Sequence, residues 1–301
     1  MENLAEFLHA SIRLTTPLLL AALGGAFMQV AAVPNIGMEG MMLIAALVGY
    51  IVSFTTGSWV LGLIAGVLSA VLVGLIYSFF VLRLKADIFA IGITLNILMA
   101  GVAAYIIRQY YDQISMLLSP NAKLLPTISI PALATNKVIN SLFNNYSILI
   151  PISFLLVLVT YFIFYKTPFG FWLRAAGSNP LAVSASGKNI TGIRFAAFII
   201  SAAFCGLAGA HLSLGYLGMF ALSLVAGRGF VALAIVLFGN GNPITLLIAS
   251  LIFGMADAAS LRIPIEVMPP QFPLMLPYIV TILAITLMSR FSRSFTGTEQ
   301  Q

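Results

Sequence analysis

The chain is dominated by apolar runs, most of them long enough to cross the hydrocarbon core of a bilayer. Hydrophobic residues make up 61% of its 301 residues and charged residues only 7%. A soluble domain carries about 25% charged residues, whereas a transmembrane helix needs about 20 consecutive apolar residues. The sequence therefore predicts one all-α, polytopic integral membrane bundle over residues 1–301, with roughly eight to ten transmembrane helices.

Nine apolar runs can be assigned as spans. They cover residues 14–33, 41–54, 59–82, 88–107, 147–165, 195–216, 221–239, 244–261 and 272–289. The polar, proline-containing segment 108–146 is predicted to be an extracytoplasmic loop. Segment 166–194 carries four basic residues and no acid, which places it in the cytoplasm by the positive-inside rule. Arg290 and Arg293 place the C-terminus on that same side, so nine spans leave the N-terminus outside.

Charge and cysteine content exclude several functions. The net charge of +6 comes from basic residues that mostly flank apolar runs, as orientation signals do, so nucleic-acid binding is not indicated. Cys205 is the single cysteine and excludes an intrachain disulfide. The chain has no Gly-x-x-x-x-Gly-Lys-Ser/Thr loop for ATP, and no clustered acids or histidines at a membrane face. No enzyme activity, metal or cofactor is predicted.

Two glycine-containing interruptions break the apolar pattern in different halves of the chain. The first is Asn35-Ile-Gly-Met-Glu-Gly40 and the second is Gly227-Arg-Gly229. Each places one charge between glycines, and a charge at the bilayer centre costs about 2.5 to 3.5 kcal/mol on insertion scales. Broken helices are tolerated where their backbone lines a cavity. Either both interruptions touch headgroup water, or Glu39 and Arg228 lie near a solute pathway, linked electrostatically across pseudo-symmetric repeats.

Other polar residues within the apolar runs are weaker candidates. Asn96 could bond a solute hydroxyl or base edge, and could equally hold two helices together. Asp257 and His211 are expected to have packing roles, and His211 lacks a second metal ligand. The predicted pathway residues are therefore Asn35, Glu39, Asn96 and Arg228.

The basic segment contains a predicted short helix of small residues. Asn179 and Pro180 are suited to its start and Gly187 to its end. Such a helix suits docking into a groove of another protein, although an ordinary surface connector would look the same.

Several stretches together resemble the permease subunits of bacterial ABC importers. The resemblance is to the branched-chain amino acid, ribose and nucleoside permease superfamily, and most to its simple-sugar and nucleoside branch. It lies in Asn35-Ile-Gly-Met-Glu-Gly40, residues 86–105, Arg174-Ala-Ala-Gly-Ser-Asn-Pro180 and residues 227–239. These stretches follow one another in order along nearly the whole chain.

The resemblance implies a role for the basic segment and a set of partners. Gly177, Asn179, Pro180 and Ala182 would belong to the segment that contacts the ATPase. The partners would be a second, related permease in a heterodimer, a cytoplasmic ATP-binding subunit and an extracytoplasmic substrate-binding lipoprotein, at the bacterial inner membrane. The solute could be a nucleoside, a simple sugar or a riboflavin-like compound. The alternative is an ion-coupled secondary transporter, in which Glu39 or Asp257 would bind the ion.

Overall fold

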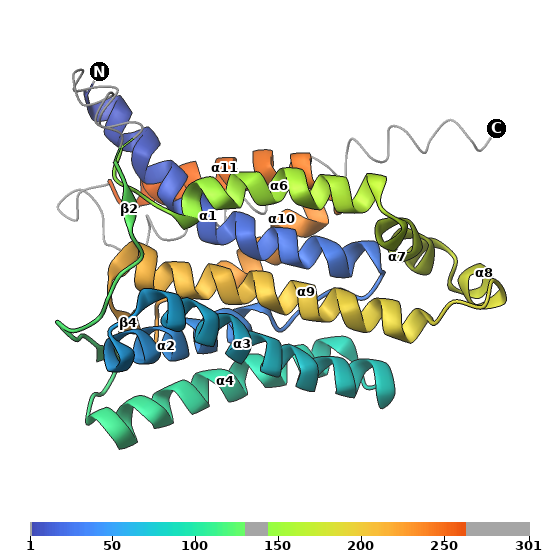
Figure 1. The fold of residues 1–301 in the computed structure, drawn as a ribbon, viewed down its shortest axis with the longest axis horizontal. Coiled ribbons are helices and arrows are strands. Elements are labelled where there is room, and N and C mark those ends of the chain that lie inside the picture. Colours follow the sequence, from blue (N-terminus) through green and yellow to red (C-terminus); the bar gives the residue numbers. More distant parts are fainter. Residues whose placement is uncertain (1, 130–143, 263–301) are drawn as a thin grey trace.

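The computed structural model describes residues 2–129 and 144–262 as a bundle of long helices that run side by side (Figure 1). The helices are α1 Glu2–Val30, α2 Met38–Thr56, α3 Trp59–Ser78, α4 Ile88–Tyr111, α6 Leu149–Lys166, α7 Pro168–Ser178, α8 Pro180–Ala185, α9 Ile190–Ala210, α10 Arg228–Gly239 and α11 Pro243–Ser260. Two π-helical segments, η1 Phe79–Arg83 and η3 His211–Leu217, extend α3 and α9. Four two-residue strands form two antiparallel pairs, β1 Met116–Leu117 with β4 Phe220–Ala221 and β2 Thr127–Ile128 with β3 Tyr146–Ser147.

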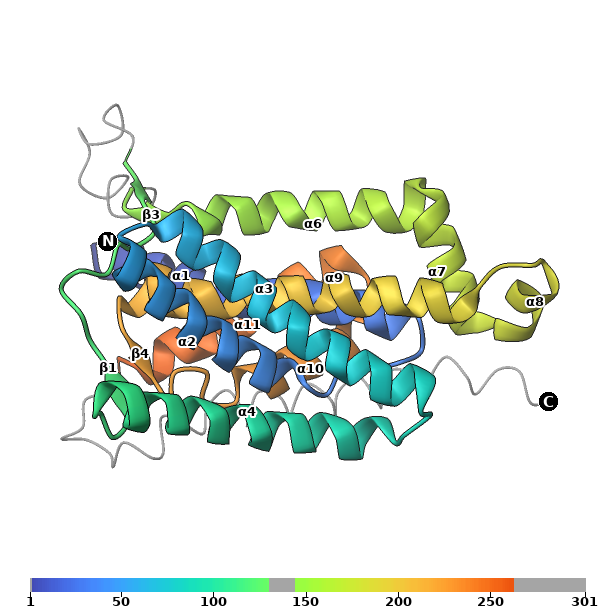
Figure 2. The same ribbon diagram turned by 60° about the horizontal axis from the view of Figure 1, so that its bottom comes forward.

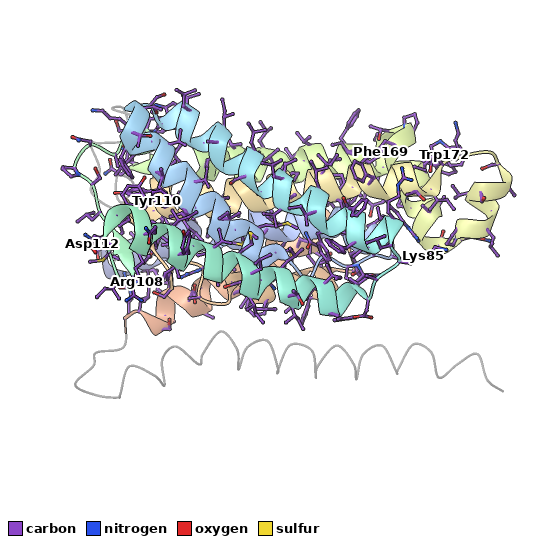
Figure 3. All side chains as sticks on the ribbon, turned by 90° about the horizontal axis from the view of Figure 1, so that it is seen from below. Lys85, Arg108, Tyr110, Asp112, Phe169 and Trp172 are labelled. Carbon is purple, nitrogen blue, oxygen red and sulfur yellow. The ribbon has the colours of Figure 1, made fainter. Side chains whose placement is uncertain are left out.

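The prediction of a polytopic helical membrane bundle is confirmed. Among the described residues, seven helices are long and apolar enough to cross a membrane, and Arg228–Gly239 is a shorter apolar helix. The predicted span 272–289, Arg290 and Arg293 lie outside the described residues. Figure 3 labels Lys85, Phe169 and Trp172 at one end of the bundle, and Arg108, Tyr110 and Asp112 at the other.

Helix α1 occupies the centre of the bundle. In the most apolar 18 residues of α1, 89% are buried inside the bundle. The corresponding share is 28% in both α3 and α4, so these two helices are peripheral. Helix α1 packs against α6, α9, α10 and α11. Small residues allow these close approaches: Gly254 of α11 lies directly against Thr15 of α1, where any side chain would collide.

Several predicted boundaries differ from the structure. The run 221–239 is not one span, because its helical part, α10, has 12 residues and is only about 18 Å long. Helix α4 continues to Tyr111, so the polar connection starts after residue 111. Segment 166–194 is mostly helical, because the Thr167 hydroxyl caps α7, Asn179 caps α8 and Asn189 caps α9.

Helices α7 and α8 lie together at one end of the bundle, and α8 projects beyond the ends of α3 and α9 (Figures 1 and 2). The predicted short helix of small residues is confirmed as α8. The side-chain oxygen of Asn179 accepts a hydrogen bond from the backbone N–H of Ala182 at 3.0 Å, with Pro180 as the first helical residue. Gly187 follows the helix with a φ of 74°, a conformation that glycine adopts readily.

Candidate functional site

Two helices in the bundle are preceded by sharp reversals of the chain. Helix α1 ends at Val30, where Ala32 takes a left-handed conformation and the N–H of Val33 donates to the carbonyl of Met28. Pro34 follows and cannot continue the helix. The chain then turns back, and α2 begins only at Met38 (Figure 1). We call residues 31–37 the first break.

The second break comprises residues 218–227, between η3 and α10. Gly218 reverses the chain with a φ of 67°, and the segment is held at its start by the pairing of β4 with β1. Ala226 and Gly227 are both left-handed, with φ angles of 45° and 81°, immediately before α10 begins at Arg228. Helix α10 is too short to cross the membrane and therefore starts within the bundle.

Glu39 joins the two breaks. It lies in the first turn of α2, and its carboxylate accepts two hydrogen bonds from the start of α10. Oε1 accepts from the N–H of Gly227 at 2.8 Å and Oε2 accepts from the N–H of Gly229 at 2.7 Å. The first N–H groups of a helix lack partners within that helix and carry a positive partial charge. The carboxylate is therefore stabilised by the N-termini of both α2 and α10.

Gly229 makes this contact possible because it has no side chain. A Cβ atom at residue 229 would lie 2.5 Å from the backbone nitrogen of Glu39 and 2.8 Å from Oε2. Both distances are shorter than van der Waals contact. Any larger residue at this position would therefore push α2 and α10 apart, so the glycine is required by the approach of the two helices.

Arg228 pairs with Asp257 of α11 and not with Glu39. Its Nη2 lies 3.4 Å from Oδ2 of Asp257, and its Nη1 donates to the carbonyl of Leu224 at 3.0 Å. Among the described residues no ion pair joins Arg228 to Glu39. The two predicted charges thus meet at one junction, but Glu39 bonds to the backbone on either side of the arginine. The sequence analysis predicted a packing role for Asp257 and did not predict its ion pair with Arg228.

Asn96 binds both sides of the start of α2. Its Nδ2 donates to the carbonyl of Ile36 at 2.9 Å and its Oδ1 accepts from the N–H of Gly40 at 2.8 Å. The backbone groups freed by the break are thus satisfied by a side chain of α4. The sequence left two roles open for Asn96, which were a contact to the solute and a contact between helices. The observed hydrogen bonds are contacts between helices.

Asn35 is buried inside the first break. Its Oδ1 accepts from the N–H of Gly37 at 3.0 Å and its Nδ2 donates to the Ser201 hydroxyl of α9 at 2.9 Å. The Tyr77 hydroxyl of α3 accepts from the N–H of Ile36 at 3.4 Å. Sequence reasoning missed Ser201 and Tyr77, because serine and tyrosine within an apolar run are not distinctive.

Gly177 connects the basic segment to the first break. It lies so close to the backbone carbonyl of Val30 that no Cβ atom would fit. Val30 is the last residue of α1, directly before the break, and the Arg194 guanidinium also ties α9 to α7 by donating to the carbonyl of Ala176 at 3.2 Å. A displacement of α7 and α8 would therefore reach the end of α1 directly.

His211 is fully buried at the start of η3, and neither ring nitrogen has a hydrogen-bond partner among the described residues. Within the part of the chain that the structure describes, no group of three or more His, Cys, Asp or Glu side chains could hold a metal ion.

The bundle and its joined breaks define a polytopic membrane protein with discontinuous helices, an arrangement typical of transport proteins. The chain belongs to the family described as the branched-chain amino acid transport system permease component, which matches residues 7–285.

Individual relatives are similar over most of the chain. The guanosine ABC transporter permease protein NupQ of Bacillus subtilis is 32% identical, over 95% of this chain and 92% of the relative. The nucleoside ABC transporter permease protein NupC of Lactococcus lactis is 28% identical, over 91% and 89%. A solved structure, described as an inward-facing conformation of a metal-chelate type ABC transporter, has a TM-score of 0.52 at 16% identity, covering 94% of this chain and 85% of that one. At this identity the likeness concerns the fold alone.

Proposed function

We propose that this chain is the transmembrane permease subunit of an ATP-driven importer and forms the pathway for a nucleoside, a simple sugar or a similar small polar solute. The observation that carries the proposal is the Glu39 carboxylate, which joins two broken helices in a chain of a transport permease family. Nucleosides are the first solutes to test, because relatives similar over most of the chain are guanosine and nucleoside permeases.

The pathway lies at the junction of the two breaks, with Asn35, Glu39, Asn96 and Arg228 as its residues. Glu39 and Arg228 are partly exposed there, while Asn35 and Asn96 hold the first break in shape. In one state of the transport cycle Glu39 is bound to Gly227 and Gly229 and the junction is closed. In the other state these bonds are broken, α2 and α10 separate, and the freed carboxylate is hydrated by the opened pathway.

Energy reaches the junction through segment 166–194, which we place in the cytoplasm as the ATPase-coupling region. Residues Gly177, Asn179, Pro180 and Ala182 belong to it. Helix α8 exposes Leu181, with 83% of this residue accessible, and so offers an apolar anchor for a groove in the ATP-binding subunit. Gly177 passes the motion to the end of α1, since it lies against the Val30 carbonyl. The sequence has no phosphate-binding loop of its own.

The other partners are a second, related permease and an extracytoplasmic substrate-binding lipoprotein. The chain is similar to two guanosine permease proteins of Bacillus subtilis, NupQ and NupP, and to two nucleoside permease proteins of Lactococcus lactis, NupC and NupB. These pairs support a heterodimer of related permeases. We place the assembly in the bacterial cytoplasmic membrane, with segment 108–146 outside and the C-terminus in the cytoplasm.

The test is uptake into proteoliposomes that contain this chain with its partner permease, ATP-binding subunit and binding protein. Guanosine and glucose are offered separately, each with ATP, without ATP, and with an ion gradient alone. The proposal expects uptake of at least one solute that requires ATP and the ATP-binding subunit. Uptake driven by an ion gradient in the absence of that subunit would instead establish an ion-coupled carrier.

A further inference from the structure

A groove of about 460 Å³ lies between the end of α3–η1 and the start of α9. Its apolar walls are Phe79, Leu82 and Phe195, and its polar end is formed by Arg83, Asn189 and Thr191. No contact described for the junction or for α8 involves these side chains. The groove is therefore separate from the Glu39 junction and from α8, and its lining residues Asn189 and Thr191 belong to segment 166–194.

The polar and apolar parts of the groove follow one another along the helix axes. Arg83 is the last residue of its span and Asn189 caps the first turn of α9, so both lie where their helices leave the bilayer. Phe79 precedes Arg83 by four residues of the π-helical segment η1, about one turn, and so lies deeper in the bilayer. Phe195 lies in the second turn of α9, inside its span. A polar end at the membrane surface above aromatic walls matches the two parts of an amphiphile.

The polar end of the groove is positively charged. Arg83 is exposed and forms no ion pair with any described residue. The nearby carboxylate of Asp87 caps α4 by accepting from the N–H of Ala90 at 2.8 Å, and Lys85 adds a second exposed cation. A guanidinium binds phosphate oxygens with two parallel hydrogen bonds, and basic pockets between spans on the cytoplasmic side bind anionic lipid headgroups.

We propose that this groove binds an anionic phospholipid. Arg83 holds the phosphate, the Thr191 hydroxyl and the Asn189 amide donate to the headgroup, and an acyl chain lies between Phe79, Leu82 and Phe195. The walls belong to membrane-spanning helices, whereas α8, the proposed ATPase contact, projects beyond them (Figures 1 and 2). A lipid fits this position better than a segment of a cytoplasmic protein. The inference rests on the proposed function only in assigning the groove to the cytoplasmic leaflet.

The experiment counts lipids that remain bound to the assembled transporter, by native mass spectrometry after extraction from nanodiscs of phosphatidylglycerol or phosphatidylcholine. We expect phosphatidylglycerol to be retained in preference to phosphatidylcholine. Arg83→Gln should weaken its retention about tenfold or more, as expected for loss of a charged hydrogen-bonding group. Arg108→Gln is the matched control, because it removes an exposed arginine at the opposite end of the bundle (Figure 3).

Phe79→Ala provides a second variant that changes no charge and should also weaken retention by opening the apolar wall. Equal losses in Arg83→Gln and Arg108→Gln, or equal retention of both lipids by the unaltered transporter, would overturn the inference. So would unchanged lipid retention in Arg83→Gln together with weaker binding of the ATP-binding subunit, which would assign the groove to that protein. Failure of the proposed function would appear separately, as absence of ATP-driven uptake by the unaltered transporter.

Discussion

Replacing Glu39 by glutamine should release the junction between the two breaks. The carboxylate accepts one hydrogen bond with each oxygen, from Gly227 and from Gly229. Glutamine keeps one acceptor oxygen but directs an NH₂ group at the other backbone N–H, so one donor is left facing another donor. Hydrogen bonds to a charged group contribute about 1.5 to 3 kcal/mol each, and the charge at a helix N-terminus contributes about 0.3 to 1 kcal/mol more.

The expected net effect is smaller than the sum of these terms, because glutamine retains one neutral hydrogen bond of about 1 kcal/mol. We expect the closed junction to lose about 2 to 6 kcal/mol relative to the open one, which shifts their populations by about 30-fold or more. Since the cycle needs both states, ATP-driven uptake should fall at least tenfold while the protein still assembles with its partners.

The assay is uptake into proteoliposomes, with Glu6→Gln as the matched control. Glu6 is an exposed acid on α1, and its carboxylate lies 3.9 Å from Arg262. Glu39→Asp distinguishes geometry from charge: it keeps the charge, but its chain is one methylene shorter and should not reach both amides. Unchanged uptake in Glu39→Gln would refute the role of the junction. Normal uptake in Glu39→Asp alone would show that the charge matters and the double contact does not.

Three further substitutions test other contacts of the same assembly. Gly229→Ala should abolish most uptake, because its Cβ would lie 2.5 Å from the backbone nitrogen of Glu39. Gly101→Ala is the control and should leave uptake unchanged, because its Cβ would have no atom within 4 Å. Equal effects of the two substitutions would contradict the packing argument. Asn96→Leu should lower the free energy of unfolding of the purified protein by about 2 kcal/mol, because two backbone groups at the start of α2 lose their partner. The measurement is thermal or denaturant unfolding. An unchanged unfolding midpoint would contradict this role of Asn96. Gly177→Ala should reduce uptake but leave ATP hydrolysis largely intact, because its Cβ would separate α7 from the end of α1. Both activities are measured in the same proteoliposomes. A parallel loss of both activities would show a general structural defect instead.

Much of the fold follows from apolar run length, and one break follows from local chemistry. Pro34 and the glycines around Glu39 interrupt the apolar pattern, and this interruption is recognisable from the sequence alone. Asn179 and Pro180 likewise start α8 where their capping chemistry predicts. These features are determined by residues adjacent in sequence, so a single sequence is sufficient to find them.

The second break could not be predicted in full, because residues 221–226 are as apolar as a span. They are held out of a helix by distant partners: β4 pairs with β1, and the N–H of Leu222 donates to the carbonyl of Ser115 at 2.9 Å. The partner of Glu39 was missed for a related reason. Arg228 offered an obvious opposite charge, but backbone N–H groups leave no signature in a sequence.

The gating role of Glu39 is tested most directly by structure determination of the assembled transporter in two nucleotide states, with the distances from the Glu39 carboxylate oxygens to the amide nitrogens of Gly227 and Gly229 measured in each. One state should keep the present distances of 2.8 and 2.7 Å. In the other state both hydrogen bonds should be broken, with α2 and α10 separated at the junction. If both bonds persist unchanged in the two states while the solute pathway opens and closes elsewhere, Glu39 does not gate the pathway.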